Sequence, residues 1–260
     1  MLVVTSADAA LAVNGLGVRF GRREVLAGVS FAIGRGELVG VVGPNGAGKS
    51  TLFRAICGLV DHRGEVVIGG VRCHHHRDRM STAFIPQRAA LDPDFPITVG
   101  ELVESGRRRF RRWWCRSSAP DRRATEAALA TVHLTGRERD PVGILSGGQL
   151  QRALLARALA QDADILLLDE TLAGIDAPTT AELLALFRRI VDEGRTLLVA
   201  THDLAVARRS FDRCLALNGR LVADGPPTRV LAGAALEATF GSGPVPDATE
   251  TGEAVVGATP

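Results

Sequence analysis

Hydrophobic residues along this chain gather in short runs separated by glycine-rich turns. Residues 12–42 alternate brief apolar stretches with turns and end in the apolar run 37–42, which is typical of strands. Residues 50–59 place apolar side chains at helical spacing, and Gly58 is a suitable end for that helix. The pattern therefore predicts a strand, a glycine-rich loop and a helix in succession.

The later part of the chain predicts an α/β fold with a helical insert. Residues 64–87 indicate two strands around a polar turn, and residues 98–160 have a mostly helical pattern with a break near Asp140. The runs 165–168 and 196–200 are short and continuously apolar, which is typical of parallel strands buried on both faces. A helical pattern lies between these two runs and predicts a β-α-β unit.

Composition narrows the classes of function. A net charge of +2 over 260 residues gives no global attraction to nucleic acid, so we expect no specific nucleic-acid partner. The apolar runs are shorter than the roughly 20 residues of a membrane-spanning helix, and the first residues lack the features of a secretory signal. The four cysteines form no CxxC pair and are expected to be free thiols of a cytoplasmic protein. Residues 241–260 are rich in Gly, Pro, Thr and Ala and are expected to form a flexible tail.

The sequence GPNGAGKS, which ends at Ser50, fits the phosphate-binding loop G-x-x-x-x-G-K-[ST] without deviation. Gly43, Gly46 and Gly48 allow backbone N–H groups to converge on phosphates at a helix N-terminus. Lys49, the only lysine among 31 basic residues, is expected to reach the β- and γ-phosphates. The Ser50 hydroxyl is expected to bind Mg²⁺.

Two carboxylates follow the predicted strand at 165–168. Asp169 is expected to hold Mg²⁺, and Glu170 to orient and deprotonate the attacking water. Parallel strands present their carboxyl ends at one edge of a sheet, so both side chains should lie beside the phosphate-binding loop. A strand that ends in Asp-Glu is common by itself, and the pair gains its meaning from the loop.

The sequence LSGGQ, ahead of this strand, narrows the kind of nucleotide-hydrolysing protein. With the phosphate-binding loop, Gln87, the two carboxylates and His202 in this order, the chain resembles the ATP-binding cassette (ABC) family over roughly residues 10–240. The resemblance implies an α/β P-loop NTPase fold, with an antiparallel β subdomain and a helical subdomain inserted at about residues 88–160. It also implies hydrolysis of ATP with Mg²⁺.

The resemblance assigns roles to single residues. It implies a homodimer that clasps ATP, in which Ser146, Gly147 and Gly148 of one copy contact the γ-phosphate held by the other. Gln87 resembles the glutamine that touches Mg²⁺ and the attacking water, and His202 resembles the histidine that contacts the γ-phosphate.

Further positions complete the nucleotide site that the resemblance implies. Asp176 resembles the aspartate that bridges the two sites across the dimer. The chain has no tyrosine to stack on adenine, and Phe20 is the best-placed aromatic residue, an ordinary core position being the equal alternative. Thr171 stands where family members commonly have proline, which puts the stiffness of that loop in question. The remaining nucleotide-contacting positions are Pro44, Asn45, Ala47, Thr51 and Gln149.

The resemblance implies a membrane permease as partner and, through it, an extracellular or periplasmic substrate-binding protein, which places the chain on the inner face of the cell membrane. The FPITV stretch within residues 91–107 resembles subunits of zinc and manganese importers, so a divalent metal ion is the expected cargo. Uptake of iron chelates or cobalamin, and a soluble ABC ATPase without a transport role, are the alternatives.

Two unusual segments each allow two interpretations. The sequence CHHH at residues 73–76 favours a polar turn over a metal site, because consecutive histidines in an extended segment cannot all face one ion. Residues 107–116 interleave arginine with aromatic residues, which favours a place near the permease and lipid headgroups or a solvated basic face.

Overall fold

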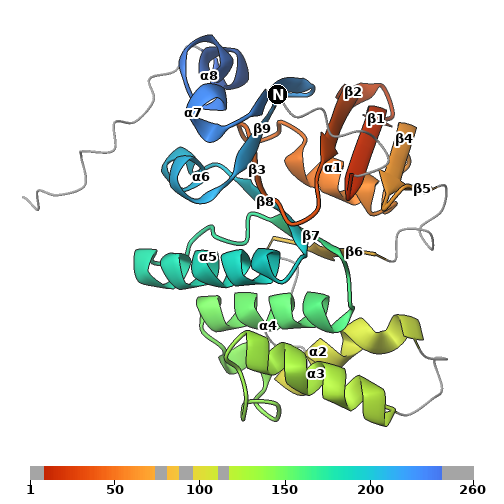
Figure 1. Ribbon diagram of the computed structural model, residues 1–260, viewed down its shortest axis with the longest axis vertical. Coiled ribbons are helices and arrows are strands. Elements are labelled where there is room, and N and C mark those ends of the chain that lie inside the picture. The colour runs from red at the N-terminus through yellow and green to blue at the C-terminus, as the bar shows by residue number, and fades with distance from the viewer. Residues whose placement is uncertain (1–8, 74–80, 88–95, 111–116, 242–260) are drawn as a thin grey trace, which may run out of the picture.

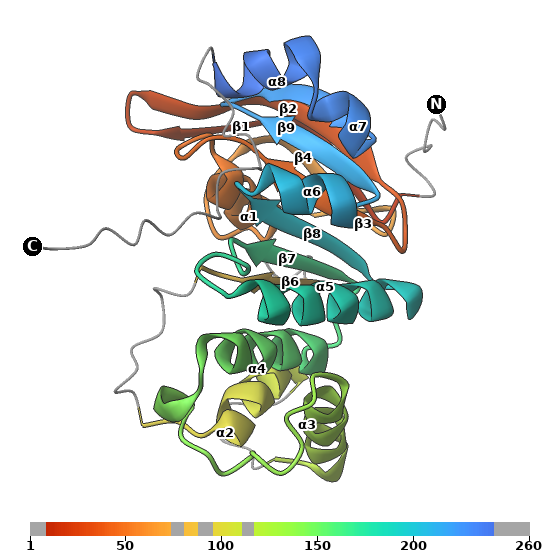
Figure 2. The ribbon, with the colours of Figure 1, turned by 90° about the vertical axis from the view of Figure 1, so that its left-hand side faces the viewer.

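The chain folds into two β-sheets and the helices that surround them (Figure 1). The computed structural model describes residues 9–73, 81–87, 96–110 and 117–241. In Figure 2 the sheets occupy the upper part of the molecule, and a separate group of helices forms the lower part.

The smaller sheet is antiparallel and carries the N-terminal strands. They are β1 (Leu11–Phe20), β2 (Arg23–Ile33), β4 (Arg63–Ile68) and β5 (Val71–Arg72), in the order β2-β1-β4-β5. Gly21, with a φ of 58°, lies in the tight turn between β1 and β2. This turn pairs the last residue of β1 with the first residue of β2.

The larger sheet contains the apolar runs that the pattern predicted. Its strands are β3 (Leu38–Val42), β6 (Thr82–Ile85), β7 (Ile165–Asp169), β8 (Thr196–Thr201), β9 (Arg213–Leu217) and β10 (Leu221–Gly225). The order is β10-β9-β3-β8-β7-β6, with β10 antiparallel to β9 and the other neighbours parallel. Every residue of β3, β7 and β8 is buried, which explains why these runs are continuously apolar. Their carboxyl ends meet at one edge of the sheet.

Two groups of helices accompany the sheets. Around the larger sheet lie α1 (Lys49–Ile56), α5 (Ala177–Asp192), α6 (Leu204–Ser210), α7 (Pro227–Val230) and α8 (Gly233–Phe240). The lower group in Figure 1 contains α2 (Val99–Glu104), α3 (Ala119–Thr131), α4 (Gly147–Ala160) and the 3₁₀ helices η3 (Ser105–Phe110) and η4 (Val142–Ile144). Helices α2, α3 and α4 each begin with a capping box, which satisfies backbone N–H groups of the first turn.

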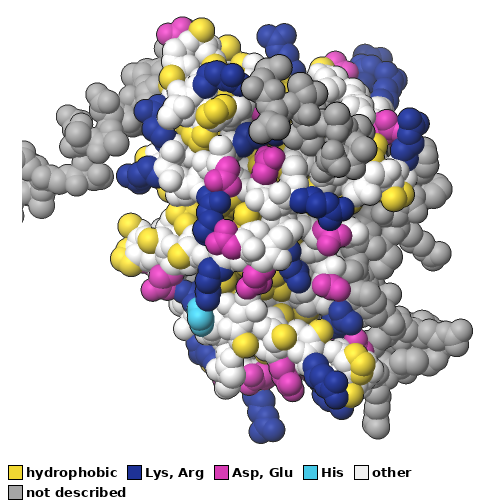
Figure 3. All heavy atoms as spheres, in the orientation of Figure 1, with side chains coloured by type: hydrophobic (Ala, Val, Ile, Leu, Met, Phe, Trp, Pro, Cys, Tyr) yellow, Lys and Arg dark blue, Asp and Glu magenta, His cyan; other side chains and the backbone are white. Residues whose placement is uncertain are grey.

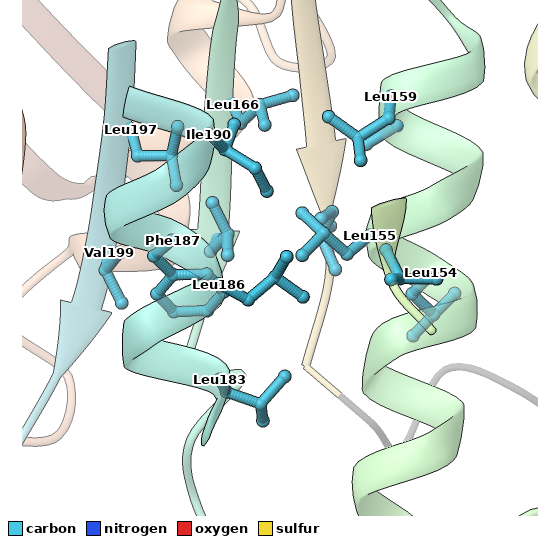
Figure 4. Packing of buried hydrophobic residues seen from close by; sticks show 14 of the residues in the cluster. Leu154, Leu155, Leu159, Leu166, Leu183, Leu186, Phe187, Ile190, Leu197 and Val199 are labelled. Carbon is cyan, nitrogen blue, oxygen red and sulfur yellow. The ribbon is translucent and has the colours of Figure 1, made fainter. Parts of the chain in front are cut away.

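Apolar side chains of α4 and α5 connect the lower helices to the larger sheet. Figure 4 shows Leu154 and Leu155 of α4 opposite Leu183 and Leu186 of α5, with β6, β7 and β8 alongside. Burial of each such side chain stabilises the fold by about 1.5–3 kcal/mol. The position of α4 is therefore coupled to β7, the strand that ends in Asp169.

The prediction of two strands within residues 64–87 was incomplete. The structure has three strands there: β4 and β5 form a hairpin in the smaller sheet, whereas β6 joins the larger sheet beside β7. A short apolar run looks the same in a hairpin and in a buried parallel strand, so the pattern could not assign β6 to its sheet. The polar turn expected near residues 74–80 and the tail at 242–260 lie outside the described residues.

The described surface matches the small net charge. On the face in Figure 3, acidic and basic side chains are intermingled. Cys57, Cys73 and Cys214 are buried and form no disulfide with one another, and Cys115 lies outside the described residues with much of the arginine-rich segment. None of the described helices is long and apolar enough to cross a membrane.

Candidate functional site

Glycine residues shape the loop between β3 and α1. Gly46 and Gly48 have φ values of 80° and 97°, in the left-handed region that glycine adopts without strain. A Cβ atom on Gly48 would lie 2.6 Å from Cδ2 of Leu26, so β2 leaves no room for a side chain there. The first N–H groups of α1 follow directly and have no partner within the helix. The loop thus has the backbone shape that a phosphate chain requires.

Segments far away in the sequence fix this loop through backbone hydrogen bonds and close packing. The N–H of Gly219 donates to the carbonyl oxygen of Ala47 at 2.9 Å, and the N–H of Ala27 donates to the carbonyl oxygen of Gly219 at 2.8 Å. A Cβ atom on Gly43 would lie 2.1 Å from the carbonyl oxygen of Leu217. The loop is therefore fixed between β2 of the smaller sheet and the end of β9 in the larger sheet.

The Lys49 side chain lies at the base of the site and is 5% exposed. Its ammonium donates to the carbonyl oxygens of Gly43 at 2.8 Å and Pro44 at 3.1 Å. It also lies 3.7 Å from Oε1 of Glu170. Burial lowers the pKa of Lys49, and the charges of Glu170 and Asp169 oppose that decrease.

The Asp169 carboxylate is buried beside the start of α1. It is 2% exposed, and its Oδ1 atom has no hydrogen-bond partner among the residues that the structure describes. Burial raises the pKa of Asp169, whereas a hydrogen bond from Ser50 opposes the increase. A buried carboxylate oxygen without a partner, next to a serine hydroxyl, fits the oxygen ligands that Mg²⁺ prefers.

Glu170 has an uncommon backbone conformation that directs its side chain. Its φ is 48°, in the left-handed region that residues with a side chain rarely adopt. Its N–H donates to the carbonyl oxygen of Ala200 at 3.2 Å, which holds it at the edge of the sheet. Nε2 of Gln87 donates to its Oε2 atom at 3.0 Å. Three residues predicted from the sequence, Lys49, Gln87 and Glu170, are thus brought into contact.

A cavity of about 490 Å³ lies over the phosphate-binding loop. Strand β2 contributes Arg23 and Val25 to its lining, two residues that were not predicted from the sequence. The register of β2 with β1 shifts beside Val25, so the regular alternation of a strand does not predict which of its side chains face the loop. The other lining residues are Asn45, Gly46, Ala47, Gly48, Lys49, Ser50, Thr51, Gln87 and Glu170.

The LSGGQ segment forms the N-terminus of α4, apart from this cavity. The Ser146 hydroxyl accepts a hydrogen bond from the N–H of Gln149 at 3.3 Å, and the Gln149 side chain accepts one from the N–H of Ser146 at 3.0 Å. Gly148 faces the first turn of α5. None of the described residues that line the cavity comes from positions 146–149. Within one chain, the two loops do not form a common site.

A second cavity, of about 500 Å³, shares Glu170 with the first. His202, just after β8, lines it. Asp176 instead caps α5: its Oδ1 atom accepts a hydrogen bond from the N–H of Thr179 at 3.0 Å, which lowers the pKa of Asp176. The structure brings His202 to the cavity beside Glu170, and it shows a capping role for Asp176 within its own chain.

Two positions that depart from the family pattern differ in burial. Phe20 is 53% exposed at the end of β1, so the alternative of an ordinary core residue was wrong. Phe20 does not line the cavity over the loop, and its stacking role stays a prediction. Thr171 is 2% exposed, and its hydroxyl has no hydrogen-bond partner among the described residues.

Comparison with known proteins gives consistent matches. A family model described as ABC transporter matches residues 26–173. The manganese transport system ATP-binding protein MntB of Halalkalibacterium halodurans is 39% identical over 214 residues, which are 82% of this chain and 85% of that protein. The protein of that name from Bacillus subtilis is 38% identical, with 86% and 89% covered. A solved metal-chelate type ABC transporter in an inward-facing conformation has a TM-score of 0.79 and 26% identity, over 89% of this chain and 88% of that chain.

Proposed function

This chain belongs to the ABC transporter family, and on that premise we propose that it is the Mg²⁺-dependent ATP-hydrolysing subunit of a transporter for a divalent metal ion, manganese or zinc. The observation that carries the proposal is the contact of Glu170 with Lys49 and Gln87 beneath the cavity over the phosphate-binding loop. We infer that the catalytic unit spans residues 10–240, with its helical subdomain at about 88–160.

The contacts of Glu170 suggest how the chain acts on ATP. The loop N–H groups and the Lys49 ammonium would bind the phosphates at the N-terminus of α1. Glu170 would then accept a proton from the attacking water, and the amide of Gln87 would orient the carboxylate and the water. His202, in the adjoining cavity, would contact the γ-phosphate. General-base catalysis of this kind contributes roughly 10²–10⁴-fold to a rate.

Mg²⁺ would be held by the Ser50 hydroxyl, the Asp169 carboxylate and Gln87. When bound, the cation neutralises charge that develops on the phosphates. The unpartnered Oδ1 atom of Asp169 supports this assignment, because a buried carboxylate oxygen otherwise costs free energy.

A complete site would need a second copy of the chain. Ser146, Gly147 and Gly148 lie apart from the cavity of their own chain, and the N-terminus of α4 can offer a hydroxyl and N–H groups to the γ-phosphate held by a partner. Gln149 would keep Ser146 in place through the capping box. Asp176, at the neighbouring end of α5, would bridge the two sites across the homodimer.

The cargo is proposed from the relatives and from the FPITV stretch within residues 91–107, which resembles subunits of metal importers. The two manganese-system relatives are 39% and 38% identical, against 26% for the metal-chelate structure, which favours a bare metal ion over a chelate. An extracellular substrate-binding protein would deliver the ion to the permease. Uptake of iron chelates or cobalamin is the alternative.

The ATPase proposal is tested by phosphate release from purified protein with ATP and Mg²⁺, with and without its permease. Glu170→Gln should reduce the rate by at least about 10²-fold, because the amide cannot accept the proton. Exposed Glu193, at the end of α5, supplies the matched control Glu193→Gln, which should retain activity. Glu170→Gln protein should also form a dimer with ATP. Full activity of Glu170→Gln would remove the proposed base.

The cargo is tested separately in vesicles that contain the permease and this chain. ATP-driven uptake should be faster for manganese or zinc than for an iron chelate or cobalamin. Faster uptake of an iron chelate or cobalamin would contradict the proposed cargo and support the alternative.

A further inference from the structure

Arg23 lies at the rim of the cavity over the phosphate-binding loop. It is the first residue of β2, it is exposed, and it lines the cavity together with Val25. Both residues face the cavity although the register of β2 with β1 shifts beside Val25. No motif of the sequence includes Arg23, and the apolar pattern of a single strand does not distinguish it from its neighbours.

The strand that carries Arg23 is held firmly against the loop. The carbonyl oxygen of Val25 lies 3.3 Å, and Cδ2 of Leu26 lies 2.6 Å, from the position of a Cβ atom on Gly48. The hydrogen bonds from Ala27 to Gly219 and from Gly219 to Ala47 close a continuous backbone link between β2 and the loop. The distance between Arg23 and the phosphate-binding loop is therefore set by the fold.

The charged residues around the cavity suggest that a second cation, besides Lys49, can bind an anionic ligand. Among the described lining residues, Lys49 and Arg23 are the cations and Glu170 is the anion. The Lys49 ammonium is buried and already contacts two carbonyl oxygens and Glu170. Arg23 is exposed, so its guanidinium can turn toward a bound anion. A guanidinium forms strong charge-assisted hydrogen bonds with phosphate oxygens.

We propose that Arg23 is a nucleotide-binding residue whose guanidinium pairs with the phosphate chain of ATP from the β2 side, opposite the N-terminus of α1. The inference rests on the proposed ATPase function and adds a residue to its site. Phe20, directly across the hairpin from Arg23, then lies at the outer rim, beyond the phosphates. We expect Arg23 to act on binding and not on the chemical step, because among the described residues the Glu170 side chain contacts Lys49 and Gln87 and not Arg23.

The neighbouring arginine supplies a matched control. Arg22 is also exposed, belongs to the turn and does not line the cavity. We would measure the Kd of ATP by calorimetry, and the KM and kcat of ATP hydrolysis, for the wild type and for Arg23→Ala, Arg23→Gln, Arg23→Lys and Arg22→Ala. Thermal unfolding of each variant establishes that it folds, and Arg23→Gln retains much of the side-chain length if Arg23→Ala does not fold.

The expected result is a rise of about tenfold in Kd and KM for Arg23→Ala and Arg23→Gln, equivalent to about 1.4 kcal/mol, with kcat unchanged. Arg23→Lys should retain most of the affinity, and Arg22→Ala should bind as the wild type does. Wild-type affinity in Arg23→Ala, an equal loss in Arg22→Ala, or no recovery in Arg23→Lys would each overturn the ion pair with phosphate. Failure of the wild-type chain to bind ATP at all would instead remove the proposed function, and this inference with it.

Discussion

Replacing Gly148 with alanine tests how tightly α4 packs against α5. An added Cβ atom would lie 2.3 Å from Cγ2 of Thr179, whereas Cβ and Oγ1 of Thr179 lie at 3.7 and 3.9 Å. Carbon atoms in favourable contact are about 3.5–4.0 Å apart, so Gly148→Ala requires a displacement of about 1 Å. Rotation of Thr179 about χ1 would break the hydrogen bond between its hydroxyl and Asp176, which leaves movement of the helices as the main response.

The structure also indicates how much stability Gly148→Ala should lose and which second substitution should restore it. Overpacking of this kind costs about 1–3 kcal/mol, and each kcal/mol lowers the Tm by about 2–4 °C in a protein of this size. Thr179→Ser removes the one methyl group that clashes and leaves only atoms at ordinary contact distance. The double variant should therefore melt close to Thr179→Ser alone. Thermal unfolding of the wild type, both single variants and the double variant forms a cycle that isolates the contact.

ATPase measurements on the same four proteins separate packing from nucleotide contact. If Gly148 also approaches a nucleotide held by the partner, the double variant regains stability but not activity. A Gly148→Ala protein that melts like the wild type, or a double variant with no recovery in Tm, would refute the packing argument.

Three further changes have defined outcomes. Burial raises the pKa of Asp169 in the folded protein above its ordinary value of 3.8. The folded state therefore loses stability relative to the unfolded state as the pH rises from about 4 through the raised pKa. Asp169→Asn should raise the Tm of nucleotide-free protein at about pH 8, and this gain should disappear near pH 4. Gly43→Ala would place Cβ 2.1 Å from the carbonyl oxygen of Leu217, so calorimetry should show loss of ATP binding and the Tm should fall. Arg107→Ala would remove the ion pair with Asp121, which keeps its hydrogen bonds from Ser118, and should cost about 1.5 kcal/mol in urea unfolding.

The parts of the site that were predicted from the sequence depend on residues close together in the chain. The phosphate-binding loop follows from glycine spacing between a strand and a helix, and the carboxyl ends of parallel strands bring Asp169 and Glu170 to that loop. Arg23 could not be found in this way, because its place depends on the register of β1 with β2 and on the backbone link through Gly219. The sheet to which β6 belongs is also set by a tertiary partner, β7.

The electrostatics of the site follow from the same burial that shapes it. Burial lowers the pKa of Lys49 and raises that of Asp169, so in both residues the loss of hydration outweighs the attraction of nearby opposite charges. A site tuned for stability alone would not keep two such charges buried. The arrangement is explained if phosphates and a cation supply the missing partners, because a ligand present at 100 times its Kd stabilises the folded state by about 2.7 kcal/mol. Asp169→Asn should then be more stable than the wild type without nucleotide and gain less from ATP and Mg²⁺.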